Sequence, residues 1–263
     1  MERRFNFSVD EYYHVYSRGT ERREIFLDKH DRERFIKLLY ILNSEKAFKF
    51  RDVQGYSFGS LERGNQRTAI GAYCLMPNHF HLLVRETEEG GLSLFMQKLL
   101  TAYSMYFNKK YARSGRLFES TFRAQFVDND NYLKYLFAYI HLNPVKLLEP
   151  EWKEKGIQDE EKALEYLKQY RYSSFNEHMG EERDEEAILS KEHFPGYFEE
   201  PKDFKELLSD WLNYRDGEEE AIAPENSEGE VEDGIKPLSI SKEELERRSE
   251  EALLDLEAVL AEG

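Results

Sequence analysis

Two apolar segments separated by a short turn constrain the fold of this chain more than any other feature. Residues 68–75 and 79–85 are largely apolar, and Met76-Pro77-Asn78 lies between them. Proline and asparagine favour turns, and short apolar runs bounded by turn residues are typical of buried strands. We therefore predict two adjacent strands joined by this turn.

The second of these strands carries two histidines. His79 and His81 flank Phe80. Alternate residues of a strand share a face, so both imidazoles are expected to point the same way, with their Cα atoms about 6.6 Å apart. This geometry suits two nitrogen atoms that bind one metal ion. Paired histidines on a strand can also be ordinary surface residues, and a partner elsewhere in the chain is needed to decide.

A helix is predicted over Asp130–Leu142. It can be capped by a residue among 128–130, and Pro144 restricts Asn143, so we expect the helix to end there. The apolar residues recur at the spacing of one helix face: Leu133, Leu136, Phe137 and Ile140.

Tyr139 and Asn143 are four residues apart, so they lie on nearly one face of this helix, about 6 Å apart along its axis. A tyrosine beside an amide could supply a nucleophile and a metal ligand. The alternative is a packed aromatic residue on an ordinary helix. His141 points elsewhere and is the weaker candidate for a ligand. Tyr132 and Tyr135 compete as nucleophiles, but neither has an asparagine four residues later.

The remaining elements complete a β-α-β-β-α-β-α order. This order predicts an α+β fold, an antiparallel sheet with helices packed on it. The further elements are a strand at 12–17, a helix capped by Asp28 or Asp31, a loop at 55–66, a helix at 93–111 and an extended segment at 115–128.

The charge is distributed unevenly along the chain. The net charge is −16 over 263 residues, but residues 1–150 hold 23 Lys and Arg against 18 Asp and Glu, a net of +5. Residues 151–263 hold 14 against 35, a net of −21. Such asymmetry is typical of a nucleic-acid-binding part with an acidic tail.

Several protein classes are disfavoured by composition. No apolar run approaches the ~18 residues of a membrane helix, and the first residues do not resemble a signal peptide. The single cysteine, Cys74, cannot form an internal disulfide or a cysteine-built zinc site. These features favour a cytoplasmic protein.

The last part of the chain differs in character. Residues 216–240 are acidic and are predicted to form a linker, and Ser241 with Glu244 offers a capping box for a final helix at 241–263. We therefore divide the chain into a main domain at 1–176, an extension of it at 177–215, the linker and the helix.

Five motifs in one order resemble the REP-associated tyrosine transposases, a branch of the single-tyrosine HUH transposases. The resemblance spans about residues 12–176. The motifs are Tyr13-His14-Val15-Tyr16-Ser17-Arg18-Gly19, Ala72-Tyr73-Cys74-Leu75-Met76-Pro77-Asn78-His79-Phe80-His81, Gly115-Arg116-Leu117-Phe118, Tyr139-Ile140-His141-Leu142-Asn143-Pro144-Val145 and Tyr172-Ser173-Ser174-Phe175.

The resemblance implies a ferredoxin-like core with the histidine pair on a central strand. It also implies Mg²⁺ or Mn²⁺ held by His79 and His81, with Asn143 as the expected third ligand. Tyr139 would attack single-stranded or hairpin DNA to form a 5′-phosphotyrosine link. A monomer or a homodimer would fit. His14 could face the site, although a packed histidine with satisfied hydrogen bonds is favoured.

Two departures from the family pattern concern DNA contact. Thr121 stands where a basic residue is usual, and an acidic, helix-like insertion runs from about 149 to 169. Four arginines near predicted strand or loop ends could contact phosphates: Arg18, Arg113, Arg116 and Arg123. Two other functions stay open. The chain could bind nucleic acid without cutting it, or it could be a metal-dependent nuclease that uses water.

Overall fold

A four-stranded antiparallel sheet forms the centre of the protein. The computed structural model describes residues 7–198 and 200–212. The strands are β1 (Tyr12–Arg18), β2 (Thr68–Met76), β3 (His79–Glu86) and β4 (Arg123–Val127), in the order β2-β3-β1-β4. With one helical connection on each side of the β2–β3 hairpin, this is the ferredoxin-like arrangement. The predicted α+β class is confirmed.

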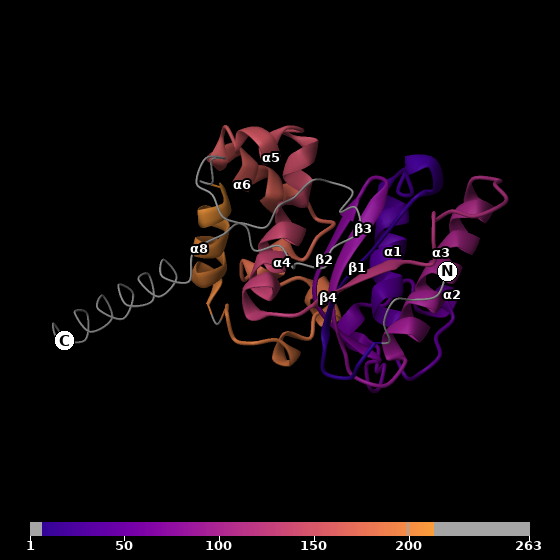
Figure 1. Cartoon of the computed structure of the whole chain (residues 1–263). Helices are drawn as coiled ribbons and strands as arrows, with labels where there is room; N and C mark the ends of the chain where they lie inside the picture. The colour runs from indigo at the N-terminus through magenta and orange to yellow at the C-terminus, as the bar shows by residue number, and fades with distance from the viewer. Residues whose placement is uncertain (1–6, 199, 213–263) are drawn as a thin grey trace. The chain divides into compact units, whose positions relative to one another are not determined.

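Helices cover both faces of the sheet. Helices α1 (Lys29–Leu42) and α3 (Gly91–Lys110) pack on one face, and α4 (Asp130–Leu142) packs on the other (Figure 1). Helix α8 (Pro201–Leu212) packs against α4, and α6 (Glu160–Gln169) packs against the 3-10 turn that follows α4. The remaining short helices are α2 (Phe50–Val53), α5 (Trp152–Lys155) and α7 (Phe175–His178).

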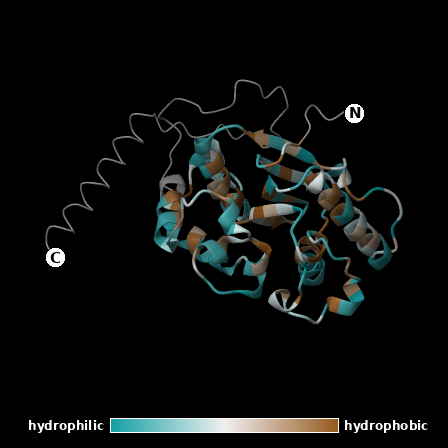
Figure 2. Ribbon diagram, turned by 90° about the horizontal axis from the view of Figure 1, so that it is seen from below, coloured by the Kyte–Doolittle hydropathy of each residue, from teal (hydrophilic) through white to brown (hydrophobic). Residues whose placement is uncertain are grey.

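The two faces of the central strands differ in chemistry because side chains alternate along a strand. Tyr13, Val15, Phe80 and Leu82 belong to the main apolar core under α1 and α3. Their neighbours His14, Tyr16, His79 and His81 therefore point to the face covered by α4. In Figure 2 the helices around the sheet carry both hydrophilic (teal) and hydrophobic (brown) residues.

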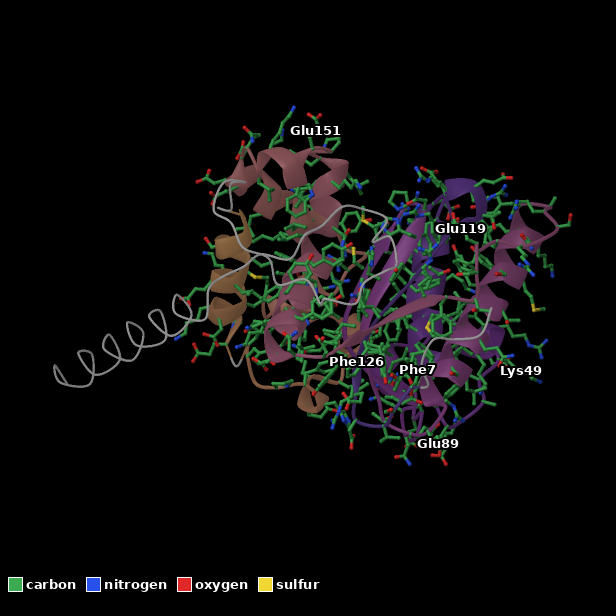
Figure 3. The ribbon with its side chains drawn as sticks, viewed as in Figure 1. Phe7, Lys49, Glu89, Glu119, Phe126 and Glu151 are labelled. Carbon is green, nitrogen blue, oxygen red and sulfur yellow. The ribbon has the colours of Figure 1, made fainter. Side chains whose placement is uncertain are left out.

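The far end of the same core is closed by aromatic rings. Phe7 lies edge-on to Tyr13, with ring centroids 4.9 Å apart, and Phe126 of β4 lies 5.8 Å from Tyr13. Figure 3 shows Phe7 and Phe126 at this end of the sheet. Phe126 retains 39% exposure because β4 is an edge strand.

Helix α1 begins with a capping box. The Asp28 side chain accepts a hydrogen bond from the amide of Asp31, and the Asp31 carboxylate accepts one from the amide of Asp28. Asp31 is fully buried and also accepts hydrogen bonds from Lys110 (2.7 Å) and Tyr111 (2.7 Å). The carboxylate therefore joins the start of α1 to the end of α3.

The structure corrects two expectations. The extended segment predicted at 115–128 forms a strand only over Arg123–Val127, and it begins with a loop that contacts the end of β1 through backbone hydrogen bonds and the isolated Gly19–Phe118 bridge. Helix α4 ends at Leu142, as predicted, but Asn143 itself keeps helical dihedral angles (φ −50°, ψ −40°) and begins a 3-10 turn, Asn143–Leu147. The restriction that Pro144 places on Asn143 is a bias, and local packing overrides it here.

Other expected elements agree with the structure. The 55–66 passage is a loop with one 3-10 turn, and the 149–169 insertion contains α5 and α6. The linker and helix predicted for 216–263 lie outside the described residues. Within the described part of the chain, no helix has both the length and the apolar character required to span a membrane.

Candidate active site

The histidine pair lies at the start of β3, where three strands bring polar side chains to one face. The rings of His79 and His81 are nearly perpendicular, with centroids 4.9 Å apart. In the strand register, His79 pairs with Arg18, and His81 pairs with Tyr16. Tyr16 in turn pairs with Arg123 of β4. Since directly paired residues point to the same side, the sheet presents these five side chains on one face.

A neighbouring amide sets the protonation of the His79 ring. Nδ2 of Asn78 donates to the Arg22 carbonyl (3.3 Å), which turns Oδ1 of Asn78 toward Nδ1 of His79 at 2.6 Å. An amide oxygen only accepts hydrogen bonds, so Nδ1 of His79 carries the proton. The lone pair of the neutral ring then lies on Nε2, which is the nitrogen left available to a metal ion.

His81 is held in a similar way by a third histidine. Nε2 of His14 lies 2.9 Å from Nδ1 of His81, and the two rings stack with centroids 5.1 Å apart. Burial lowers the pKa of His14 to about 3, so this ring is neutral and can accept a hydrogen bond. With the proton on Nδ1 of His81, Nε2 of His81 has the lone pair. His14 thus faces the site as well as being a packed histidine.

Tyr139 contacts this histidine cluster from α4. Its ring centroid lies 5.5 Å from that of His81 and 5.7 Å from that of His14, both edge-on. Tyr135 stacks on Tyr139 at 5.7 Å, and Tyr132 stacks on Tyr135 at 5.9 Å. Burial raises the pKa of Tyr132 and Tyr135, which disfavours their ionised, nucleophilic form. Tyr139 is the member of this stack that contacts the histidines.

Asn143 lies one turn beyond Tyr139, as the spacing predicts. It is buried, and its Nδ2 donates to the Tyr139 carbonyl at 2.8 Å. Because the amide nitrogen is engaged, Oδ1 is the atom that could bind a metal ion. The hydrogen bonds described for Asn143 do not reach His79 or His81, so the structure brings together part of the predicted ligand set.

His141 points away from the site. Its Nδ1 lies 2.7 Å from the Phe137 carbonyl, and its Nε2 lies 2.7 Å from Oγ of Ser174. Oγ of Ser174 accepts a hydrogen bond from the Tyr73 amide (2.9 Å). Residues 172–174 extend along the edge of β2, so this network ties α4 to the sheet. His141 would have to break both hydrogen bonds to act as a ligand.

The four predicted arginines occupy different places. Arg18 and Arg123 lie on the site face, as cross-strand partners of His79 and Tyr16. Arg116 is exposed in the loop before β4. The carbonyl of the next residue, Leu117, accepts a hydrogen bond from the Thr20 amide. Arg113 donates to the side chain of Asn108 at 3.0 Å, which ties it to the end of α3.

Close approach of the backbone holds the end of β1 against the β2–β3 turn. The Gly19 amide donates to the Asn78 carbonyl at 2.9 Å. A Cβ atom at Gly19 would lie only 2.3 Å from the Arg23 carbonyl oxygen. Glycine is therefore required here, next to Arg18 and the residue that orients His79.

The donor set fits a divalent cation with open coordination positions. Among residues 7–198 and 200–212, no group of three His, Cys, Asp or Glu side chains is placed to bind one ion. A site at the histidine pair therefore needs an oxygen ligand of another kind, and the Asn143 amide could supply it. Mixed imidazole and oxygen ligands do not select one metal by softness.

Three residues that the sequence did not single out belong to this site. Asn78 orients His79, Tyr16 lies with its ring centroid 6.0 Å from that of His81, and Gln125 pairs with His14 across the sheet. The register of β1 against β3 and β4 would have revealed Tyr16 and Gln125. Sequence spacing contains no such information, because these strands are far apart along the chain.

Part of the chain is similar to a known protein family. Residues 63–143 match the model of a family described as transposase, IS200-like. The matched segment includes His79, His81, Tyr139 and Asn143. The predicted transposase resemblance is confirmed.

The comparisons with curated proteins and with solved structures give less information about this chain. No curated protein matches the sequence. A solved structure described as the REP-associated tyrosine transposase bound to a REP hairpin is similar, with 14% sequence identity and a TM-score of 0.40. The similarity covers 68% of this chain and 86% of that chain. A likeness this distant carries no argument about ligand or mechanism.

Proposed function

We propose that this chain is a metal-dependent transposase and endonuclease of single-stranded or hairpin DNA, with Tyr139 as the nucleophile. The observation that carries this proposal is the edge-on contact between Tyr139 and His81, whose ring centroids are 5.5 Å apart. It joins a nucleophile and a metal-ligating side chain that are 58 residues apart in the sequence, inside the segment that matches the transposase family. We further propose that residues 1–176 hold the chemistry, that 177–215 extend this core, and that the protein works in the cytoplasm as a monomer or homodimer.

His79, His81 and Asn143 would hold Mg²⁺ or Mn²⁺. When bound, the ion supplies Lewis-acid polarisation of the scissile phosphate and a template for its orientation. Asn78 and His14 keep the two imidazoles in the tautomer that presents Nε2. Both ligands are thereby oriented before any ion binds.

In the proposed reaction, Oη of Tyr139 attacks the phosphorus atom in line with the leaving oxygen. The bond between Oη and phosphorus forms as the bond between phosphorus and O3′ breaks. The tyrosine proton is lost, and the departing O3′ gains a proton to become a 3′-hydroxyl. The product is a 5′-phosphotyrosine link, which keeps the phosphodiester bond energy, so attack by a 3′-hydroxyl can rejoin strands.

Positive charge beside the pair would position the DNA backbone. Arg18 and Arg123 share the site face, and Arg116 is exposed in the adjoining loop. Arginine suits this role because its guanidinium can donate two parallel hydrogen bonds to a phosphate. Arg113 would act at the end of α3, where its bond to Asn108 limits its reach.

A denaturing gel tests the proposal. Labelled hairpin DNA is incubated with the full chain and Mn²⁺, and a protein–DNA adduct that survives detergent is expected. Cleavage without an adduct would favour a nuclease that uses water, and binding without cleavage would favour a silent binding module. Either result would refute the tyrosine mechanism.

A further inference from the structure

A cavity of about 700 Å³ lies on the outer side of α1. Its walls come from α1, α2, α3 and the turn at Arg171 and Tyr172. Helix α1 packs on the sheet face opposite α4, so this cavity is separate from the Tyr139 site (Figure 1).

Arg34 lines the cavity with a guanidinium group that has no carboxylate partner among the described residues. The group lies 3.3 Å from the centre of the Phe50 ring and 4.6 Å from that of Tyr106. Its Nε atom is buried without a hydrogen bond, and no carboxylate of the described residues pairs with it. Burial lowers the pKa of Arg34, which means that the cation has lost hydration that an anion could replace.

Lys37 lies one turn further along α1 and faces the same space. Its ammonium donates to the Tyr56 carbonyl and lies 4.4 Å from the centre of the Phe58 ring. Burial also lowers the pKa of Lys37. A second partly dehydrated cation therefore stands beside Arg34.

Two carboxylates in the cavity wall have other polar contacts, and the contact of Glu33 is an ion pair only when His30 is protonated. Glu33 contacts His30 at 3.2 Å, and Glu185 contacts Arg183 at 3.4 Å. Neither forms an ion pair with Arg34 or Lys37, and the carboxylate that acts on the Lys37 charge, Asp184, lies outside the cavity lining. The cavity therefore offers charge and hydrogen-bond donors to an anion.

Aromatic rings occupy the same walls. Tyr56 is 59% exposed, which is unusual for so large a ring, and Tyr106 is fixed by its hydrogen bond to Asp31 (2.9 Å). Unpaired bases stack on such rings with little sequence preference, and cations nearby bind the backbone phosphates. A free phosphate ion would contact the two cations but would leave the exposed Tyr56 ring without a binding partner.

We propose that this cavity binds one unpaired nucleotide of a DNA strand, with its phosphate on Arg34 and Lys37 and its base against Tyr56. The choice of DNA rests on the proposed function. The site would hold a flanking part of the substrate on the side of the sheet away from Tyr139. It would add affinity without taking part in the chemistry.

Photo-crosslinking of the full chain tests this site. A short oligothymidine that contains iodouracil is irradiated with the protein in the presence of a chelator, so that no cleavage occurs, and crosslinked residues are identified by mass spectrometry. We expect a crosslink at Tyr56. Arg34→Gln with Lys37→Gln should weaken oligonucleotide binding at this site about tenfold. Arg51→Gln, which removes an exposed charge from α2 outside the cavity, should leave the crosslink unchanged.

Three results would overturn the inference. Crosslinks could fall only on the Tyr16 and Tyr139 face, or the Tyr56 crosslink could persist at full yield in the double variant. Inorganic phosphate could also displace the oligonucleotide at equal concentration, which would identify a site for free phosphate compounds. None of these results bears on the tyrosine mechanism, because the adduct assay with Mn²⁺ tests that mechanism separately.

Discussion

Nε2 of His14 lies 2.9 Å from Nδ1 of His81, and this contact joins the first strand of the sheet to the proposed metal ligand. The two residues are diagonal neighbours across β1 and β3, so the strand register alone sets their separation. His14 is 6% exposed, and burial keeps it neutral. A neutral acceptor in this position fixes the tautomer of His81 without adding positive charge beside a cation.

His14→Ala should therefore weaken metal binding while the fold persists. Residues that hydrogen-bond to the non-coordinating nitrogen of a metal-binding histidine contribute about 10–100-fold in metal affinity. Calorimetric titration with Mn²⁺ measures this directly, and His30→Ala, which alters an exposed histidine of α1, is the matched control. Equal Mn²⁺ affinity in the wild type and His14→Ala would show that His81 is oriented by other groups.

Asn78→Ala should act on His79 in the same way. The variant loses the Oδ1 atom that selects the protonated Nδ1, so both tautomers of His79 become populated and Mn²⁺ affinity falls. Asn78→Asp keeps an acceptor oxygen at this position and should restore much of the affinity. A merely structural role for Asn78 predicts no such rescue. Loss of affinity in both variants would contradict the tautomer argument.

Tyr139→Phe should bind hairpin DNA as the wild type does but form no covalent adduct. The substitution removes only the hydroxyl group and keeps the ring that packs against His14, His81 and Tyr135. Tyr135→Phe is the control, because its ring stacks behind Tyr139. Detergent-resistant adducts are counted on a denaturing gel. An adduct formed by Tyr139→Phe would move the nucleophile to another tyrosine.

The local elements of this site are predictable from sequence because short-range patterns determine them. The apolar runs at 68–75 and 79–85, with a turn between them, predict the hairpin that carries the histidines. The apolar spacing of 130–142 predicts α4, which the side chain of Asn129 caps. The four-residue spacing likewise predicts the contact between Asn143 and Tyr139.

The long-range relationships are not predictable in the same way. The contact of His14 with His81 depends on the register of strands that are 67 residues apart. The loop before β4 resembles an extended segment in sequence, but only Arg123–Val127 finds a partner strand. Residues 172–174 pair with the edge of β2 through contacts about 100 residues apart, which no local pattern reveals.

Ser174→Ala should destabilise the protein through the helix that carries Tyr139. The variant leaves Nε2 of His141 and the Tyr73 amide without their hydrogen-bond partner in a buried place. Such a loss costs about 1–3 kcal/mol in the free energy of unfolding. Urea denaturation measures it, with the exposed Ser60→Ala as the control. A change below about 0.5 kcal/mol would mean that water replaces the serine hydroxyl.

Because of the buried Asp31 carboxylate at the start of α1, we expect the free energy of unfolding to fall at acid pH. Although burial opposes ionisation of Asp31, hydrogen bonds from Lys110 and Tyr111 hold its pKa below the ordinary value of 3.8. Because the folded state has the lower pKa, the stabilisation is fully present above the unfolded value of about 4 and is lost as pH falls below it. Urea denaturation between about pH 6 and pH 2 should show this loss.

Lys110→Met separates this cluster from general acid denaturation. The variant removes the ammonium that lies 2.7 Å from Asp31 and 2.8 Å from Asp28, so stability near neutral pH should fall by about 2 kcal/mol. The loss of stability below about pH 4 should also be smaller than in the wild type, because the folded pKa of Asp31 rises toward its unfolded value. Lys109→Met removes the same charge from the same helix end and should change neither quantity. Equal acid sensitivity in both variants would mean that Lys110 does not set the pKa of Asp31.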